Sequence, residues 1–342
     1  MSDITEQHAG AVGVPAIGRW RWIGQGARIF ARQREATIFV VAAALFAYFA
    51  VTNSSFTSEA NLVVLSQDIA PIIIIAIGEV LLLICGEIDL SVGFIYAFAP
   101  FMMHYMIDDG VPVLPAILIA LLLGLAAGWF NGFLTVTLGL PSFITTLGTG
   151  FLLYGLMLTT SHAEPVIPPS SAAGAGKWLG SYSWSMIIWA VALLAIFHVV
   201  LTRTRWGLHT VATGGNLLGA REAGINVGRI KYGNFMITGL LGALVGLQVA
   251  FQTNDIDPLA GGYQPMFYAV TAAVIGGTAM LGGSGTMIGA LLGSIVLGVL
   301  TDGFTVIGIS ANPLPIIFGG AVLIAMIANV QLSRLRESGR MK

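Results

Sequence analysis

Residues 61–85 read NLVVLSQDIAPIIIIAIGEVLLLIC, an apolar run interrupted only by the carboxylates Asp68 and Glu79 and a few neutral polar side chains. A helix of about 20 apolar residues is long enough to cross the hydrocarbon core of a bilayer. The whole chain of 342 residues has the same character, since 56% of it is apolar and only 9% is charged. Soluble domains carry about 25% charged residues. Because lipid admits only helices and closed barrels, and these runs are continuous rather than alternating, the sequence predicts an all-α integral membrane protein.

The basic residues show which segments face the cytoplasm, because Lys and Arg beside membrane spans stay on that side during insertion. All of the 15 basic residues except Lys177 fall in three groups: Arg19, Arg21, Arg28, Arg32 and Arg34; Arg203, Arg205, Arg221, Arg229 and Lys231; and Arg334, Arg336, Arg340 and Lys342. We therefore expect both termini and the segment 202–231 to be cytoplasmic.

Hydropathy predicts about ten transmembrane helices. The apolar runs lie at 36–52, 61–85, 92–107, 113–137, 142–160, 184–201, 232–251, 267–282, 286–307 and 314–331. Six runs precede the segment 202–231 and four follow it. Both numbers are even, as they must be if this segment and both termini lie on the same side of the membrane. Several runs are shorter than a straight crossing needs, so we expect broken or re-entrant helices. The expected domains are a cytoplasmic segment 1–35, a membrane domain 36–331 and a cytoplasmic tail 332–342.

Small residues indicate that the helices pack closely together. Glycines recur at four-residue spacing at three places: Gly124, Gly128 and Gly132; Gly242 and Gly246; and Gly285, Gly289 and Gly293. In lipid, helices associate through the close backbone approach that such residues permit. The pattern predicts a compact bundle.

Acidic side chains in or near the apolar runs are the candidate pathway residues. An ionisable group at membrane depth is costly and suggests a functional site, and no basic residue lies at that depth to pair with it. We expect Glu79, Glu87, Asp89 and Ser91 to lie near a translocation pathway or its inner gate. The alternative for Asp89 and Ser91 is a structural role, capping a helix that begins near Val92.

The segment 202–231 is too polar to span the membrane. Asn216 can cap a short helix that runs through Ala223, and Gly224 can end it. We expect this helix to form a rigid cytoplasmic projection rather than a solvated connector.

The sequence contains no arrangement of nucleophile, base and orienting group, and its five histidines lack the spacing of metal ligands. We therefore expect no catalytic residues, no metal site and no cofactor. The net charge of −1 gives no indication of a nucleic-acid partner, and the single Cys85 excludes an internal disulfide.

Four stretches resemble one family. Residues Gly86–Gly93, GEIDLSVG, resemble the GGIDLSVG signature of the permease subunits of bacterial ABC importers for monosaccharides of the ribose, xylose and arabinose type. Residues Pro141–Gly148, PSFITTLG, match that family's PxFIxTLG stretch. Residues 214–227 resemble its cytoplasmic GxNxxAAxxSGIxV segment, and residues 274–285 its GGTxLxGGxG segment.

The resemblance implies a permease bundle of the type II importer fold in the bacterial inner membrane, without nucleotide hydrolysis of its own. It implies three partners: an ATP-binding subunit, an extracytoplasmic sugar-binding protein and a second permease chain, either identical or a sister permease. The segment that contacts the ATP-binding subunit would include Gly215, Asn216, Ala220, Ala223, Gly224 and Ile225.

The chain also departs from the family pattern. The departures are Glu87 in place of a second Gly, Arg221-Glu222, Gln264-Pro265, and Asp302 in place of Asn. Three other functions stay open. They are an ABC permease for nucleosides or branched-chain amino acids, a proton-coupled secondary transporter that needs no partner, and a membrane scaffold that does not transport.

Overall fold

The computed structural model describes residues 34–309, 312–320, 323–324 and 327. Within these residues the fold is helical, and the β-structure is limited to an isolated bridge between Val166 and Ile256. The expected segment 1–35 and tail 332–342 fall almost wholly outside the described residues.

Seven helices in the described part of the chain are long and apolar enough to cross a membrane. They are α2 (Arg34–Thr52), α3 (Glu59–Ile84), α5 (Val113–Gly132, continued as a π-turn to Thr137), α6 (Ser142–Ser161), α8 (Ser185–Arg203), α11 (Val227–Thr253) and α13 (Met287–Val306). Each coincides with one of the predicted runs.

The other three predicted runs do not give full-length helices, so a count of ten crossings is not confirmed. The run 92–107 is α4 (Val92–Asp108), with 17 residues. The run 267–282 is α12 (Tyr263–Ile275), with only 13 residues, because Gly277 takes a φ of 87° and ends the helix. The run 314–331 is helical where it is described, but part of it is outside the described residues.

The segment 202–231 contains more helix than expected. Beyond α8 come α9 (Arg205–Gly215) and α10 (Leu217–Glu222). Helix α11 begins at Val227, five residues earlier than the predicted run, because the Asn226 side chain accepts a hydrogen bond from the Arg229 N–H at 2.9 Å. The first basic residues of α11 are therefore helical.

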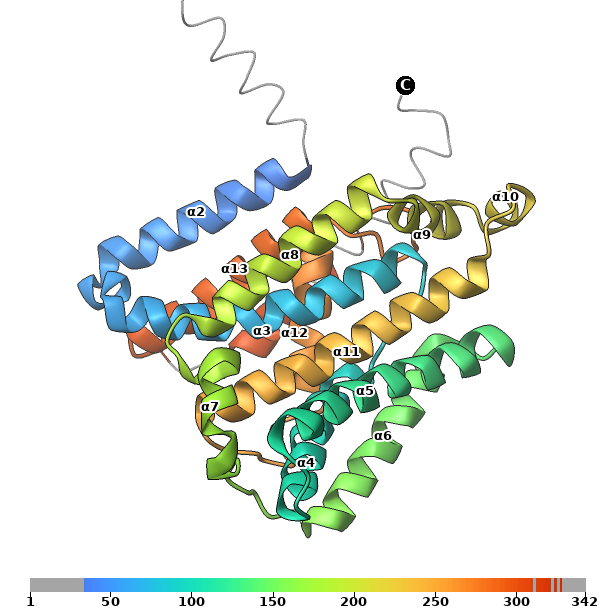
Figure 1. Cartoon of the computed structure of the whole chain (residues 1–342). Coiled ribbons are helices and arrows are strands. Elements are labelled where there is room, and N and C mark those ends of the chain that lie inside the picture. Colours follow the sequence, from blue (N-terminus) through green and yellow to red (C-terminus); the bar gives the residue numbers. More distant parts are fainter. Residues whose placement is uncertain (1–33, 310–311, 321–322, 325–326, 328–342) are drawn as a thin grey trace, which may run out of the picture.

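Helices α3 and α11 form the centre of the bundle (Figure 1). Nearly all of α3 from Ile72 to Ile84 is buried. Helix α11 packs along α5, and glycines at the contact allow the two backbones to approach closely. A Cβ at Gly128 would come within 2.2 Å of the Phe235 carbonyl oxygen, and one at Gly239 within 2.2 Å of the Gly124 carbonyl oxygen. The predicted glycine packing is confirmed at this contact.

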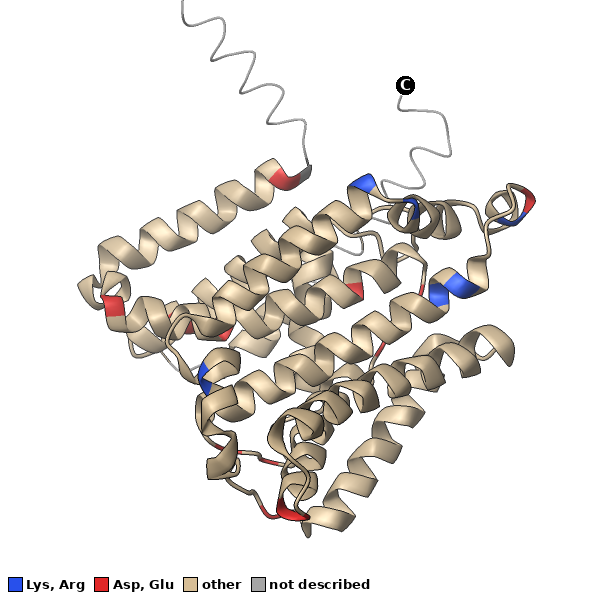
Figure 2. Ribbon diagram, in the orientation of Figure 1, with Lys and Arg blue, Asp and Glu red and all other residues tan. Residues whose placement is uncertain are grey.

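The bundle has two ends, which we name after the short helices that mark them. At the α10 end, contacts join the loop after α3 to the starts of α6 and α11 and to the loop before α13. At the α7 end, near α7 (Ala173–Gly176), contacts join the ends of α4 and α6 and the loops after them. Figure 2 shows Lys and Arg at the α10 end, with one exception near α7. Lys177 directly follows α7 in the chain.

Candidate functional site

The four sequence motifs meet at the α10 end of the bundle, although they are far apart in the chain. We call this region the hub, and define it as residues 84–91, 131, 142–146, 206–216, 231–234 and 278–285.

The loop after α3 is fixed by α6. Helix α3 ends at Cys85, and Gly86 has a φ of 76°, which turns the chain out of the helix. The Ile88 N–H then donates to the Ser142 hydroxyl at 3.4 Å, and the Leu90 N–H donates to the Thr146 hydroxyl at 3.0 Å. The first motif is thus held by hydroxyls of the second.

Asp89 and Ser91 form a buried polar cluster with Asn131 of α5. One Asp89 carboxylate oxygen accepts from the Ser91 N–H at 2.8 Å and from its hydroxyl at 2.6 Å. The Asn131 amide donates to the other Asp89 oxygen at 3.2 Å and to the Ser91 hydroxyl at 2.8 Å. The expected helix does begin at Val92, and Asp89 supports its start, whereas the Ser91 side chain makes no capping bond.

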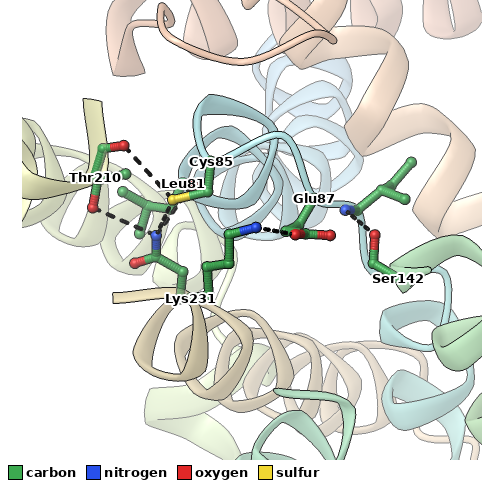
Figure 3. Close-up of polar contacts among 8 residues, drawn as sticks. Leu81, Cys85, Glu87, Ser142, Thr210 and Lys231 are labelled. Atoms are coloured by element: carbon green, nitrogen blue, oxygen red, sulfur yellow. Dashed lines mark hydrogen bonds and ion pairs between the residues drawn. The ribbon is translucent and has the colours of Figure 1, made fainter. Parts of the chain in front are cut away.

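Glu87 pairs with a basic residue, which corrects the expectation that the acidic residues have no such partner. Lys231, from the second turn of α11, donates to the Glu87 carboxylate (Figure 3). Both side chains are mostly buried, at 12% exposure for Glu87 and 17% for Lys231. The expectation was wrong because Lys231, assigned to a cytoplasmic loop, is on a helix that leads into the bundle.

Glu79 lies deeper in α3 and is fully buried. Its carboxylate oxygens accept no hydrogen bond from another side chain among the described residues, and they lie close to the carboxyl and the backbone N–H of Asp89. A buried carboxyl without side-chain partners is costly, so this position is not explained by packing alone.

Glycine backbones bring the third and fourth motifs against the end of α3. A Cβ on Gly214 would lie 1.6 Å from the Ile84 carbonyl oxygen. The same oxygen accepts from the Gly283 N–H at 2.8 Å, and Gly282 and Gly283 have φ values of 92° and 82°. Only glycine fits a contact this close with these torsions.

The expected short helix exists as α10, and its caps are confirmed. The Asn216 side chain accepts from the Gly219 N–H at 2.9 Å, and Gly224, with a φ of 79°, follows the last turn. The Ile225 N–H donates to the Ala220 carbonyl at 3.0 Å. Of the residues expected to contact the ATP-binding subunit, Ala220 is buried and Ile225 is half-buried, while Gly215, Asn216, Ala223 and Gly224 are exposed.

Helix α9, which the sequence did not predict, connects α10 to the bundle core through Asn234 of α11. The Trp206 indole donates to the Asn234 amide oxygen at 2.9 Å. The Asn234 amide nitrogen donates to the Leu81 carbonyl at 3.2 Å and lies 3.2 Å from the Cys85 sulfur (Figure 3). A single amide therefore joins α9 to the end of α3. The sequence indicated this contact only through Asn234 itself, a polar residue near the start of an otherwise apolar helix.

Two apolar grooves flank the short helix α12. One, of about 410 Å³, lies between α12, α6 and the loop after α3, and Glu87 and Phe143 line it. The other, of about 570 Å³, separates α12 from Pro315 and Phe318. Tyr263, Phe267 and Thr271 line both grooves. Glu79, Asp89 and Ser91 line neither, and lie behind the groove wall in the protein interior.

The site lacks the features of a metal centre. In the part of the chain that the structure describes, no group of three or more His, Cys, Asp or Glu side chains is placed to hold a metal ion. The polar groups of the hub instead bond helices to one another.

Seven long apolar helices, with a capped short helix projecting from one end of the bundle, are typical of a multi-pass membrane protein. Residues 61–327 match the family described as branched-chain amino acid transport system / permease component, and the chain belongs to this family.

The chain is similar over most of its length to several import permeases. It is 35% identical to a xylose/arabinose import permease protein of Sulfolobus acidocaldarius, over 89% of this chain and 86% of the relative. It is 31% identical to an autoinducer 2 import system permease protein of Photorhabdus luminescens, over 89% of this chain and 92% of the relative. It is 33% identical to a probable ABC transporter permease protein of Escherichia coli, over 88% and 90%. No solved structure matches the chain significantly.

Proposed function

We propose that the chain is the permease subunit of an ATP-driven importer of a monosaccharide in a bacterial inner membrane. The observation that carries the proposal is the convergence of the four motifs on one hub, directly behind a projecting helix. A chain that hydrolysed nucleotide itself would need a phosphate-binding loop, and the sequence has no such motif. The names of two relatives, for xylose/arabinose and for autoinducer 2, favour a small polyhydroxylated solute.

We assign α10 as the coupling element that docks on a separate ATP-binding subunit. Leu218 is 70% exposed and Leu217 38% exposed, beside the charged Arg221 and Glu222. An apolar anchor with a charged rim suits docking to a protein. The α10 end also carries basic residues, and by the positive-inside rule this supports a cytoplasmic location for it, where ATP is available. Both chain termini would then be cytoplasmic too.

A movement of α10 would be transmitted to the translocation pathway through the contacts of the hub. Helix α9 is joined to α3 and α11 by Asn234, and the loop after α3 is joined to α11 by the Glu87–Lys231 pair. Binding of ATP to the partner would bias two arrangements of these packed elements, because a ligand shifts only states with which it interacts differently. The pathway would open alternately to the two sides.

The face that carries α12 is the proposed pathway wall, closed by a second permease chain. Its grooves are apolar and exposed, and α12 is too short to cross the membrane. Glu87 would stand at the inner gate, while Glu79, Asp89 and Ser91 would fix the gate from behind. An extracytoplasmic sugar-binding protein would deliver the solute to the α7 end.

The family description names branched-chain amino acids, so the solute class is the part of the proposal that most needs a test. Uptake of labelled D-xylose and of L-leucine should be compared in cells that produce the complete importer. We expect D-xylose uptake that stops when ATP is depleted and continues when the proton gradient is collapsed. Uptake of L-leucine alone would show an amino-acid permease. Uptake that follows the proton gradient would show a secondary transporter.

A further inference from the structure

A cavity with several polar side chains in its wall opens at the α7 end of the bundle, away from the hub, and shares Gln264 and Tyr268 with the groove between α12 and Pro315. Its volume is about 350 Å³, within the range of small-molecule sites. Side chains from α3, α4, α11, α12 and α13 line it, and it is partly open to the outside of the bundle. It differs from the apolar grooves proposed to face the second permease chain in its lining, which includes the carboxylate of Asp68 and the amides of Gln67 and Gln252.

Asp68 is the charged group of this cavity. It lies on α3 nine residues after Glu59, roughly 14 Å along the helix at about 1.5 Å per residue. Among the described residues it makes no hydrogen bond or ion pair, although it stands in an apolar span. The residue is exposed, so its carboxylate is available to a ligand in the cavity.

Neutral polar and aromatic side chains complete the lining. Gln252 donates to the Gln67 amide oxygen at 3.2 Å, and Gln264 donates to the Tyr268 hydroxyl at 3.0 Å. Tyr96 of α4 also lines the cavity. Amides and phenols can both donate and accept, as alcohol hydroxyls do, and the tyrosine rings offer apolar faces.

The charges around the cavity exclude anionic solutes. No Lys, Arg or His side chain lines it among the described residues. Asp302 lies close enough to Asp68 for the two carboxyls to interact, and an adjoining cavity of about 220 Å³ is lined by Asp255 and Asp257. The carboxylate of an amino acid would meet only negative charge there.

From this chemistry we infer that the cavity is a binding site for a neutral polyhydroxylated solute within each permease chain, at the side where solute enters. Asp68 accepts hydrogen bonds from its hydroxyls, Gln67 and Gln252 donate to them or accept from them, and Tyr96 and Tyr268 contact its carbon skeleton. The inference rests on the proposed import function and adds a solute site inside the chain to a pathway between two chains.

The test is binding of D-xylose to the full-length chain in nanodiscs, measured by saturation-transfer NMR, which detects weak ligands. We expect a D-xylose signal that falls by at least about tenfold in Asp68→Asn, as the loss of a hydrogen bond to a charged group predicts. Ala260→Trp, which fills the cavity from its edge and keeps every polar group, should also lose the signal. Asp109→Asn, an exposed carboxylate at the same end, should keep it.

Equal signals from the wild type and Asp68→Asn, or no signal from the wild type, would overturn the cavity assignment. ATP-driven D-xylose uptake by the complete importer would show in either case whether the proposed function survives. A signal from L-leucine that depends on Asp68 would overturn the inferred ligand class, and with it the proposal that the imported solute is a sugar.

Discussion

At the scale of single residues, the hub depends on a few polar contacts between helices that pack mainly through apolar surface. The pair of Glu87 and Lys231 joins the loop after α3 to the start of α11. Glu87 stands where the family pattern has glycine, so the acid and its base form a contact that a glycine could not make. The sequence showed that both residues are charged but not that they pair, because the loop after α3 and the start of α11 come together only when the chain folds.

Breaking this pair should weaken both the fold and transport. In Glu87→Gln or Lys231→Met, the remaining charged group loses its partner while mostly buried, so we expect the free energy of unfolding to fall by about 2 kcal/mol. The exchange Glu87→Lys with Lys231→Glu should recover most of the loss. Denaturation of the purified chain in detergent, analysed as a double-mutant cycle, measures the coupling. Additive effects of the two single changes would contradict the contact.

The buried acids Glu79 and Asp89 should affect transport more than assembly. In Asp89→Asn an amide group replaces one of the two oxygens that accept from Ser91 and Asn131, so at least one hydrogen bond is lost. Glu79→Gln keeps the size of the side chain and removes its acid. We expect both variants to insert normally. Asp89→Asn should transport roughly tenfold more slowly, as the loss of a hydrogen bond to a charged group predicts. Glu79→Gln should also transport more slowly, because it removes an ionisable group buried in an apolar helix. Unchanged uptake and unchanged ATPase stimulation in both would remove these residues from the gate.

At the scale of elements, α10 shows what local sequence can predict. Asn216 and Gly224 mark its two ends by side-chain capping and by a positive φ, and both are local effects. Helix α9 was not predicted because its stability comes from tertiary contacts, with Trp206 bonded to Asn234 and Gly214 pressed against Ile84. Helix α12 was predicted too long, because its glycine-rich end reads as apolar.

Removal of the α10 cap should uncouple the importer. Asn216→Ala loses the hydrogen bond to the Gly219 N–H, which costs about 1 kcal/mol, or roughly fivefold in the population of the folded helix. We expect the stimulation of ATPase activity by the sugar-binding protein to fall by a similar factor. Asn216→Asp, which keeps the cap, is the matched control. Equal stimulation in the Ala and Asp variants would show that α10 does not need its cap.

The contact between α5 and α11 gives a test of packing. A Cβ at Gly239 would overlap the Gly124 carbonyl, whereas one at Gly155 on α6 meets nothing within 4 Å. Gly239→Ala should lower the free energy of unfolding by about 1–3 kcal/mol through overpacking. Gly155→Ala should be neutral or raise it by about 0.5–1 kcal/mol, because alanine favours the helix. The same loss in both variants would mean that the two helices do not approach this closely.

At the scale of the whole molecule, composition predicted the helical bundle with its long apolar helices, while the prediction that both termini share an end with the segment 202–231 falls almost wholly outside the described residues. Composition is a property of the chain as a whole, summed over many residues. The meeting of Ile84 with Gly214 and Gly283 could not be predicted in this way, because it depends on how helices pack. The resemblance indicated that the four motifs matter, and the structure shows that they form one hub.

The most direct test of the central claim compares the chain alone with the assembled importer in proteoliposomes. The claim is that this chain is a passive pathway, moved by a partner that docks on α10. We predict accumulation of D-xylose only when the ATP-binding subunit, the sugar-binding protein and ATP are all present, and its loss in Leu218→Glu, which places a charge on the exposed face of α10. Accumulation of solute, or turnover of nucleotide, by the chain alone would contradict the account.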